Sequence, residues 1–176
     1  MSTSTELLTV ADYLNIPEPQ EGHLELHHGE VVIVPPPKWR HQILQDRIST
    51  LLKAQMGDWG TVLCEMAFRP TPEFEVWQAD VGCVRADRAA SISEDEYLEG
   101  APDLVVEVLS PRNTADEIDD KRTICLENGT SSFWVVNDKR KLVSVTEGNV
   151  TKHYRRFSKI VCTLLREELP VEDILA

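Results

Sequence analysis

The stretch Leu104–Leu109, which reads Leu-Val-Val-Glu-Val-Leu, decides the fold of this chain. Its continuous apolar run, rich in β-branched residues, predicts a strand that is buried on both faces near the centre of a sheet. Glu107 lies inside this run, where an unpaired carboxylate is costly unless a partner compensates its charge or it takes up a proton. A bound cation or a buried basic side chain could each compensate the charge, and the stretch alone does not decide between them.

The segments on both sides of this strand predict a mixed α/β fold. A Thr-x-x-Glu capping box at Thr114 and Glu117 predicts a helix that ends near Gly129, and residues 132–136 predict another strand. This order is typical of a crossover between two parallel strands. The remaining patterns predict a hairpin over residues 24–34, a helix over 39–56, strands over 61–69, 76–85, 141–146 and 151–156, and a packed amphipathic tail over 164–176. We therefore expect a mixed β-sheet flanked by helices, in a single domain over residues 1–176.

The composition is that of an ordinary globular protein. The 176 residues are 41% hydrophobic and 27% charged, and no apolar run approaches the roughly 20 residues that cross a membrane. Residues 1–6 lack the basic start and apolar core of a signal peptide, so we expect a cytoplasmic protein. The four cysteines lie far apart, which predicts small, buried, reduced side chains instead of disulfides or zinc ligands.

Charge is distributed unevenly along the chain. The net charge of −12 argues against nucleic-acid binding by the whole surface. Residues 73–120 carry 14 Asp and Glu against three Lys and Arg, whereas residues 138–160 carry seven Lys and Arg against two acids. This pattern fits a metal site beside an edge that contacts phosphates, and it equally fits two solvated faces.

A second acid, Asp80, also lies within an apolar strand. If two central strands each direct one carboxylate inward, Asp80 and Glu107 meet, and Mg²⁺ or Mn²⁺ would allow both to stay ionised. Lys121 shares a helical stripe with Ile118 and Cys125, which places an amine on the side of the helix that faces the sheet. This amine could stabilise charge on a phosphate, neutralise Glu107 or extend to water, and the residues leave these alternatives open.

Two other groups of polar residues carry weaker signals. His23, His27 and His28 lie around the predicted hairpin turn, where solvent-exposed histidines are expected more often than a transition-metal site. Asp103 shares a strand face with Glu107, but its position at the strand entry favours a turn-stabilising acid over a metal ligand.

Several segments together resemble the bacterial putative restriction endonuclease family, an expanded and mostly uncharacterised group within the PD-(D/E)XK nuclease superfamily. The similar segments follow one another along nearly the whole chain, at residues 24–32, 36–42, 78–81, 100–111 and 121–136. The string from Gly100 to Pro111 is specific by itself. The resemblance implies a restriction-endonuclease-like core, metal-dependent hydrolysis of phosphodiester bonds, DNA as the partner and a homodimer as the expected assembly.

The resemblance also implies roles for five residues. Asp80 matches the motif aspartate and Glu107 the second acid, so these two are the implied ligands of Mg²⁺ or Mn²⁺. The usual Glu-x-Lys is absent, and Lys121 matches a lysine that this family places on the next helix. Glu25 matches a hairpin glutamate that adds a metal ligand or orients one, and His41 matches a histidine of the first long helix.

The chain departs from the family pattern in places that keep other functions open. Ala79 replaces the usual proline before Asp80, and Cys125 replaces an aromatic residue. A metal-dependent DNA endonuclease is the leading hypothesis. The net charge and the missing Glu-x-Lys also fit a non-catalytic interaction module that kept the fold, and the residues do not separate DNA cleavage from cleavage of RNA or branched DNA.

Overall fold

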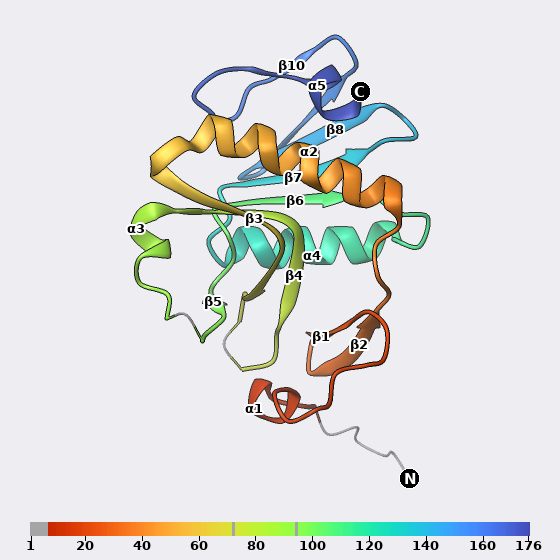
Figure 1. The fold of residues 1–176 in the computed structure, drawn as a ribbon, viewed down its shortest axis with the longest axis vertical. Helices are drawn as coiled ribbons and strands as arrows, with labels where there is room; N and C mark the ends of the chain where they lie inside the picture. The colour runs from red at the N-terminus through yellow and green to blue at the C-terminus, as the bar shows by residue number, and fades with distance from the viewer. Residues whose placement is uncertain (1–6, 72, 94) are drawn as a thin grey trace.

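The computed structural model describes residues 7–71, 73–93 and 95–176, and it has the expected mixed α/β architecture. Residues 1–6, on which the expectation about a signal peptide depends, lie outside the described residues. A seven-stranded sheet forms the centre, with the order β5-β3-β4-β6-β7-β8-β9 (Figure 1). Its strands are β3 (Gly60–Arg69), β4 (Trp77–Arg85), β5 (Leu98–Glu99), β6 (Leu104–Val108), β7 (Ser132–Asn137), β8 (Leu142–Glu147) and β9 (Val150–Arg155).

The predicted crossover is present at the centre of this sheet. β6 and β7 are parallel and are joined by α4 (Ala115–Glu127), whereas β4 is antiparallel to both β3 and β6. Thr114 caps α4, because its hydroxyl accepts from the Glu117 amide while the Glu117 carboxylate accepts from the Thr114 amide. This capping box fixes where the helix begins, and therefore which of its residues face the sheet.

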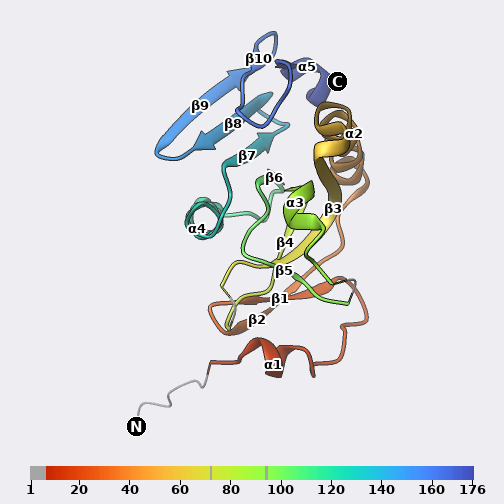
Figure 2. The same ribbon diagram turned by 90° about the vertical axis from the view of Figure 1, so that its left-hand side faces the viewer.

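Two long helices cover opposite faces of the sheet. α2 (Trp39–Met56) lies on one side and α4 on the other, as the turned view shows (Figure 2). Leu44, Ile48 and Leu52 of α2 are buried against one face of the central strands. Cys125 of α4 is buried against the other face in a second cluster of apolar side chains.

The N-terminal region forms a hairpin beside the main sheet. β1 (His23–His27) and β2 (Glu30–Val34) pair in antiparallel fashion around the expected turn, and α1 (Val10–Tyr13) packs next to them. Leu26 and Val76 exchange two backbone hydrogen bonds of 2.8 and 2.9 Å. These bonds attach the hairpin to the residue that precedes β4 and place β1 beside the start of that strand.

The C-terminal tail packs back onto the core, as its amphipathic pattern predicts. β10 (Lys159–Ile160) pairs with β11 (Leu169–Pro170), and α5 (Val171–Leu175) buries its apolar side chains in the cluster that contains α2. Two short helices were not expected from the sequence, α3 (Ala86–Ala89) and the 3₁₀ helix η1 (Gly57–Trp59). Both lie at ends of longer elements, where local pattern is weakest.

The cysteines are free thiols in the described structure, and one of them corrects an expectation. Cys83, Cys125 and Cys162 are buried as expected, but Cys64 is exposed. It precedes Glu65, at which the β3 backbone leaves the regular extended conformation, so the inward and outward alternation breaks there. Among the described residues, no helix combines the length and the apolar character needed to cross a membrane.

The sheet opens between β4 and β6, and this opening positions the candidate site. β4 pairs with β3 from Gly60↔Arg85 to Phe68↔Trp77, but it pairs with β6 only between Val81↔Val106 and Cys83↔Leu104. The first residues of β4 therefore extend past the end of their pairing with β6. Side chains from both helices and from the hairpin fill the resulting notch.

Replacing Leu52 by alanine tests the packing between α2 and the sheet. Leu52 is fully buried, so Leu52→Ala should lower the free energy of unfolding by about 2–5 kcal/mol through lost burial and the cavity left behind. Leu63→Ala is the matched control, because Leu63 is half exposed and should cost below about 1 kcal/mol. Urea denaturation measures both free energies of unfolding. Equal decreases in the two variants would contradict the packing of Leu52 between α2 and the sheet.

Candidate active site

The structure brings Asp80 and Glu107 together at the notch between β4 and β6. Extending the antiparallel register by one pair beyond Val81↔Val106 places the two acids opposite each other. Asp80 Oδ2 accepts a hydrogen bond of 2.6 Å from the backbone amide of Val108, the residue that follows Glu107. The two strand acids predicted from the sequence therefore occupy one place.

Lys121 joins this pair from α4. Its Nζ lies 2.8 Å from Glu107 Oε1 and donates a 2.6 Å hydrogen bond to the backbone carbonyl of Gln78. Lys121 is buried, at 9% exposure, so the possibility that it extends to water is wrong. The amine neutralises Glu107, which was one of the alternatives that the sequence left open.

Burial and charge act in opposite directions on this pair. Burial raises the pKa of Glu107 to about 8, and the nearby charge of Asp80 adds to the rise, although Lys121 opposes it. Burial also disfavours the charged form of Lys121, but the carboxylates of Glu107 and Glu25 outweigh it and raise the pKa of Lys121. The site thus contains a carboxyl group that takes up a proton easily and an amine that keeps its charge.

The first turns of α2 hold Asp80 from the other side. His41 Nε2 lies 2.8 Å from Asp80 Oδ1, and Gln45 Nε2 donates to the same oxygen at 3.0 Å. Burial lowers the pKa of His41, but the hydrogen bond and charge of Asp80 outweigh it and raise that pKa above its ordinary value. His41 therefore contacts the motif aspartate and orients it, as its position at the start of α2 allows.

Glu25 lies on the hairpin side, held by two histidines. Its Oε1 is 3.0 Å from His23 Nε2 and its Oε2 is 2.7 Å from His27 Nε2. Burial raises the pKa of this carboxyl, but the two hydrogen bonds together with the charge of Lys121 lower it to about 2. Glu25 is thus a buried anion that acts on Lys121 through charge, and its two oxygens are already bonded.

The expectation of solvent-exposed histidines is wrong for two of the three. The side chains of His23 and His27 are 26% and 31% exposed and both bind Glu25, because the three residues alternate onto the same face of β1. His27 also stacks on Trp77, with ring centroids 4.5 Å apart. His28 is exposed as expected and bonds to Asp120 at 2.7 Å.

Three further residues belong to the site and were not predicted. Gln45, Gln78 and Glu65 form a chain of side-chain hydrogen bonds behind Asp80. Glu65 carries the signal that identified the other acids, since it too lies inside a strand. Gln78 lies in the segment 78–81 that carries the family resemblance, whereas nothing in the sequence distinguishes Gln45 from other polar residues of its helix.

Two features lie away from these acids. Asp103, at the entry of β6, accepts 3.0 Å hydrogen bonds from the Arg85 amide and the Arg88 guanidinium, which is the turn-stabilising role expected of it. A hollow of about 100 Å³ lies between the hairpin and β4. Glu25 and Gln78 line it, but Asp80 and Glu107 do not.

The donor set of the site fits a hard divalent cation only in part. Glu107 is buried, and its Oε1 is paired with the Lys121 amine at 2.8 Å. A carboxylate pair of this kind suits Mg²⁺, which is commonly held by one or two carboxylates, waters and substrate phosphate. Within the described ranges, however, no group of three or more His, Cys, Asp or Glu is placed to hold a metal ion. Asp80 and Glu107 are therefore the residues that could bind one.

The fold and the sequence both resemble known proteins. The structure aligns with the crystal structure of a protein from Anabaena variabilis ATCC 29413, titled a putative nuclease belonging to DUF820, with a TM-score of 0.81. The two chains are 18% identical, and the alignment covers 96% of this chain and 97% of the other. No curated protein sequence matches this chain. The model of the Uma2 family, described as putative restriction endonuclease, matches residues 10–175. Since that match spans nearly every residue, the chain belongs to the Uma2 family of putative restriction endonucleases.

Proposed function

We propose that this protein is a divalent-metal-dependent endonuclease that hydrolyses phosphodiester bonds in DNA. The family supports a nuclease. The observation that carries the proposal is the convergence of Asp80, Glu107 and Lys121 at one notch of the sheet. Two carboxylates from neighbouring strands and one amine from the next helix are the groups that such hydrolysis needs.

Each group has a distinct role in the proposed reaction. Asp80 and Glu107 would hold Mg²⁺ or Mn²⁺, which lowers the pKa of a bound water and neutralises charge on the phosphate. Lys121, held by the Gln78 carbonyl, keeps a positive charge beside the place where negative charge develops. His41 keeps Asp80 oriented through their hydrogen bond. The cation, the DNA substrate and the expected homodimer stay predictions.

Replacing Glu107 by glutamine tests this site. Glu107→Gln removes a proposed ligand while keeping the shape of the side chain, so Mg²⁺-dependent nicking of supercoiled plasmid should fall by at least about a hundredfold. Glu127→Gln, at an exposed position on α4, is the matched control and should cleave like the wild-type protein. Circular dichroism checks that both variants fold. Cleavage retained by folded Glu107→Gln would contradict the site.

A non-catalytic interaction module remains the second candidate, and one observation favours it. The Asp80 carboxylate already accepts hydrogen bonds at both oxygens, and Glu107 is neutralised by Lys121. A protein that had lost turnover could keep this closed arrangement without binding any cation.

Calorimetric titration with Mn²⁺ separates the two candidates. The proposed nuclease should bind Mn²⁺, and Asp80→Asn should weaken that binding at least about tenfold because a carboxylate ligand is lost. A parallel cleavage panel of supercoiled, linear and single-stranded DNA and of RNA identifies the substrate. Wild-type protein that neither binds Mn²⁺ nor cuts any of these would favour the interaction module.

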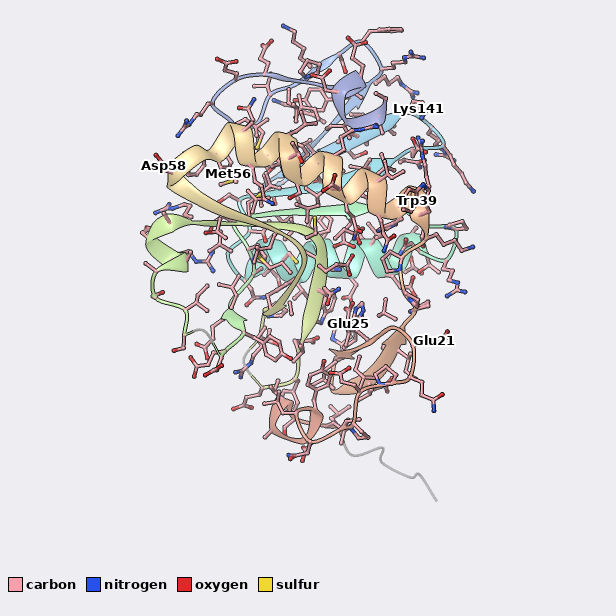
Figure 3. All side chains as sticks on the ribbon, in the orientation of Figure 1. Glu21, Glu25, Trp39, Met56, Asp58 and Lys141 are labelled. Carbon is pink, nitrogen blue, oxygen red and sulfur yellow. The ribbon has the colours of Figure 1, made fainter. Side chains whose placement is uncertain are left out.

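A basic corner beside the site supports nucleic acid as the partner. Arg40, at the start of α2, binds Asp138 with hydrogen bonds of 2.8 and 3.0 Å, which brings the loop after β7 against the helix. Lys38, Lys139 and Arg140 are exposed around this contact. Trp39 is 78% exposed there, and Figure 3 labels it on the same side of the molecule as Lys141. Exposed cations with an aromatic ring suit phosphates and bases.

Substitutions in this corner should weaken nucleic-acid binding without changing the chemistry. Lys139→Ala/Arg140→Ala should raise the KM for DNA several-fold and reduce the slope of log K against log salt by about 1 for each lost phosphate contact. Trp39→Ala should raise KM while kcat stays within about twofold, since a stacking ring is worth about 1–3 kcal/mol per base. Lys53→Ala, an exposed lysine near the other end of α2, is the control. If the KM for DNA is unchanged in both Lys139→Ala/Arg140→Ala and Trp39→Ala, DNA does not bind at this corner.

A further inference from the structure

Glu65 has an unusual backbone conformation in the middle of β3. Its φ of 52° lies in the left-handed region, which residues with side chains rarely adopt. The pairing of β3 with β4 is interrupted there, since Cys64↔Val81 and Met66↔Ala79 pair on either side. Glu65 consequently stands opposite Asp80 in the register, just as Asp80 stands opposite Glu107.

Each oxygen of the Glu65 carboxylate is held by a different glutamine. Oε1 accepts a hydrogen bond from Gln45 of α2, and Oε2 accepts one from Gln78 of β4. Gln45 is buried, at 3% exposure. A buried amide with two carboxylate neighbours must present its nitrogen to them, because carboxylates only accept hydrogen bonds.

Gln45 connects Glu65 to Asp80. An amide nitrogen carries two hydrogens, and Gln45 Nε2 donates to Glu65 Oε1 and to Asp80 Oδ1, the latter at 3.0 Å. With one hydrogen anchored on Glu65, the other is aimed at Asp80. Without Glu65 the Gln45 amide could rotate and present its oxygen to Asp80, which would repel the carboxylate.

Gln78 connects Glu65 to the lysine. The side chain of Gln78 binds Glu65, and the backbone carbonyl of Gln78 accepts the 2.6 Å hydrogen bond from Lys121. This second connection is weaker, since the backbone of Gln78 is already paired with Ala67 across the β-ladder. The two connections nevertheless meet at one carboxylate.

We propose that Glu65 is a positioning residue, which fixes the orientation of Asp80 through Gln45. This inference rests on the proposed nuclease function and deepens it. The proposed role of Glu65 lies in its hydrogen bonds, since each of its two oxygens accepts from a glutamine amide. The left-handed backbone occurs at the residue whose side chain contacts both Gln45 and Gln78.

The isosteric variant separates a positioning role from a charge or ligand role. In Glu65→Gln, the new amide oxygen can still accept from Gln45, and its nitrogen can donate to Gln78 once that side-chain amide flips. The bonds survive and the charge is lost. Glu65→Ala loses the hydrogen bonds as well as the charge. Alanine and glutamate are both residues with a Cβ, so the left-handed backbone conformation strains them alike.

Steady-state cleavage of supercoiled plasmid with Mg²⁺ tests the role. Glu65→Ala and Gln45→Ala should each lower kcat at least about tenfold with the KM for DNA unchanged, and Glu65→Gln should stay within about threefold of wild type. The double variant Gln45→Ala/Glu65→Ala should lose no more than either single variant, because Glu65 acts through Gln45. Gln42→Ala, an exposed glutamine of α2, is the control.

Three outcomes would overturn the inference. They are an unchanged kcat in Glu65→Ala, a loss in Glu65→Gln as large as in Glu65→Ala, and additive losses in the double variant. If Glu65→Ala does not fold, Gln45→Ala and Glu65→Gln decide the question, with the same expected values.

A measurement without cation or substrate keeps this inference separate from the proposed function. In nuclear magnetic resonance of the free protein, the side-chain amide protons of Gln45 should exchange slowly in wild type and Glu65→Gln, and rapidly in Glu65→Ala. Rapid exchange of these protons in the wild type would show that Glu65 does not hold the Gln45 amide. Should the wild type cleave no nucleic acid while the exchange pattern holds, the proposed function fails and the positioning of Asp80 by Glu65 stands.

Discussion

The burial of Glu107 at the end of β6 is the constraint on which the site depends. A carboxylate in a central strand is unfavourable by itself, and here it is compensated by the amine of Lys121 at 2.8 Å. That compensation requires α4 to begin where it does and to turn Lys121 toward the sheet. The crossover between two parallel strands supplies this geometry, because it packs the helix against the sheet beside β7, the neighbour of β6.

The notch between β4 and β6 is where the two acids meet. β4 continues past the end of its pairing with β6, which leaves Asp80 beside the end of that strand. The two long helices deliver different groups to this place. The first turns of α2 bring His41 and Gln45 to Asp80, and α4 brings Lys121 to Glu107.

Few of the polar atoms around these acids lack partners. Glu25 is bonded at both oxygens by His23 and His27, and Asp80 accepts from a backbone amide as well as from side chains. The buried Glu107 Oε1 is paired with the Lys121 amine. A network with most of its members satisfied is rigid, and rigidity favours a single orientation of its side chains.

The sequence by itself determined the strand around Glu107, the capping box of α4, the hairpin and the apolar stripe that includes Lys121. Each of these depends on residues near one another in the chain, and local period and turn chemistry are enough to predict them. Family resemblance extended this to Glu25 and His41.

Only the tertiary structure decided the role of Glu65, the bridging of Gln45 and the engagement of His23 and His27. Gln45 is one of several polar residues on α2, and its importance arises from contacts with residues 20 and 35 positions away. Hydrogen bonds between such distant residues depend on how the notch, the helix and the irregular backbone of β3 come together. No local pattern encodes that arrangement, because it exists only once the sheet and both helices have packed.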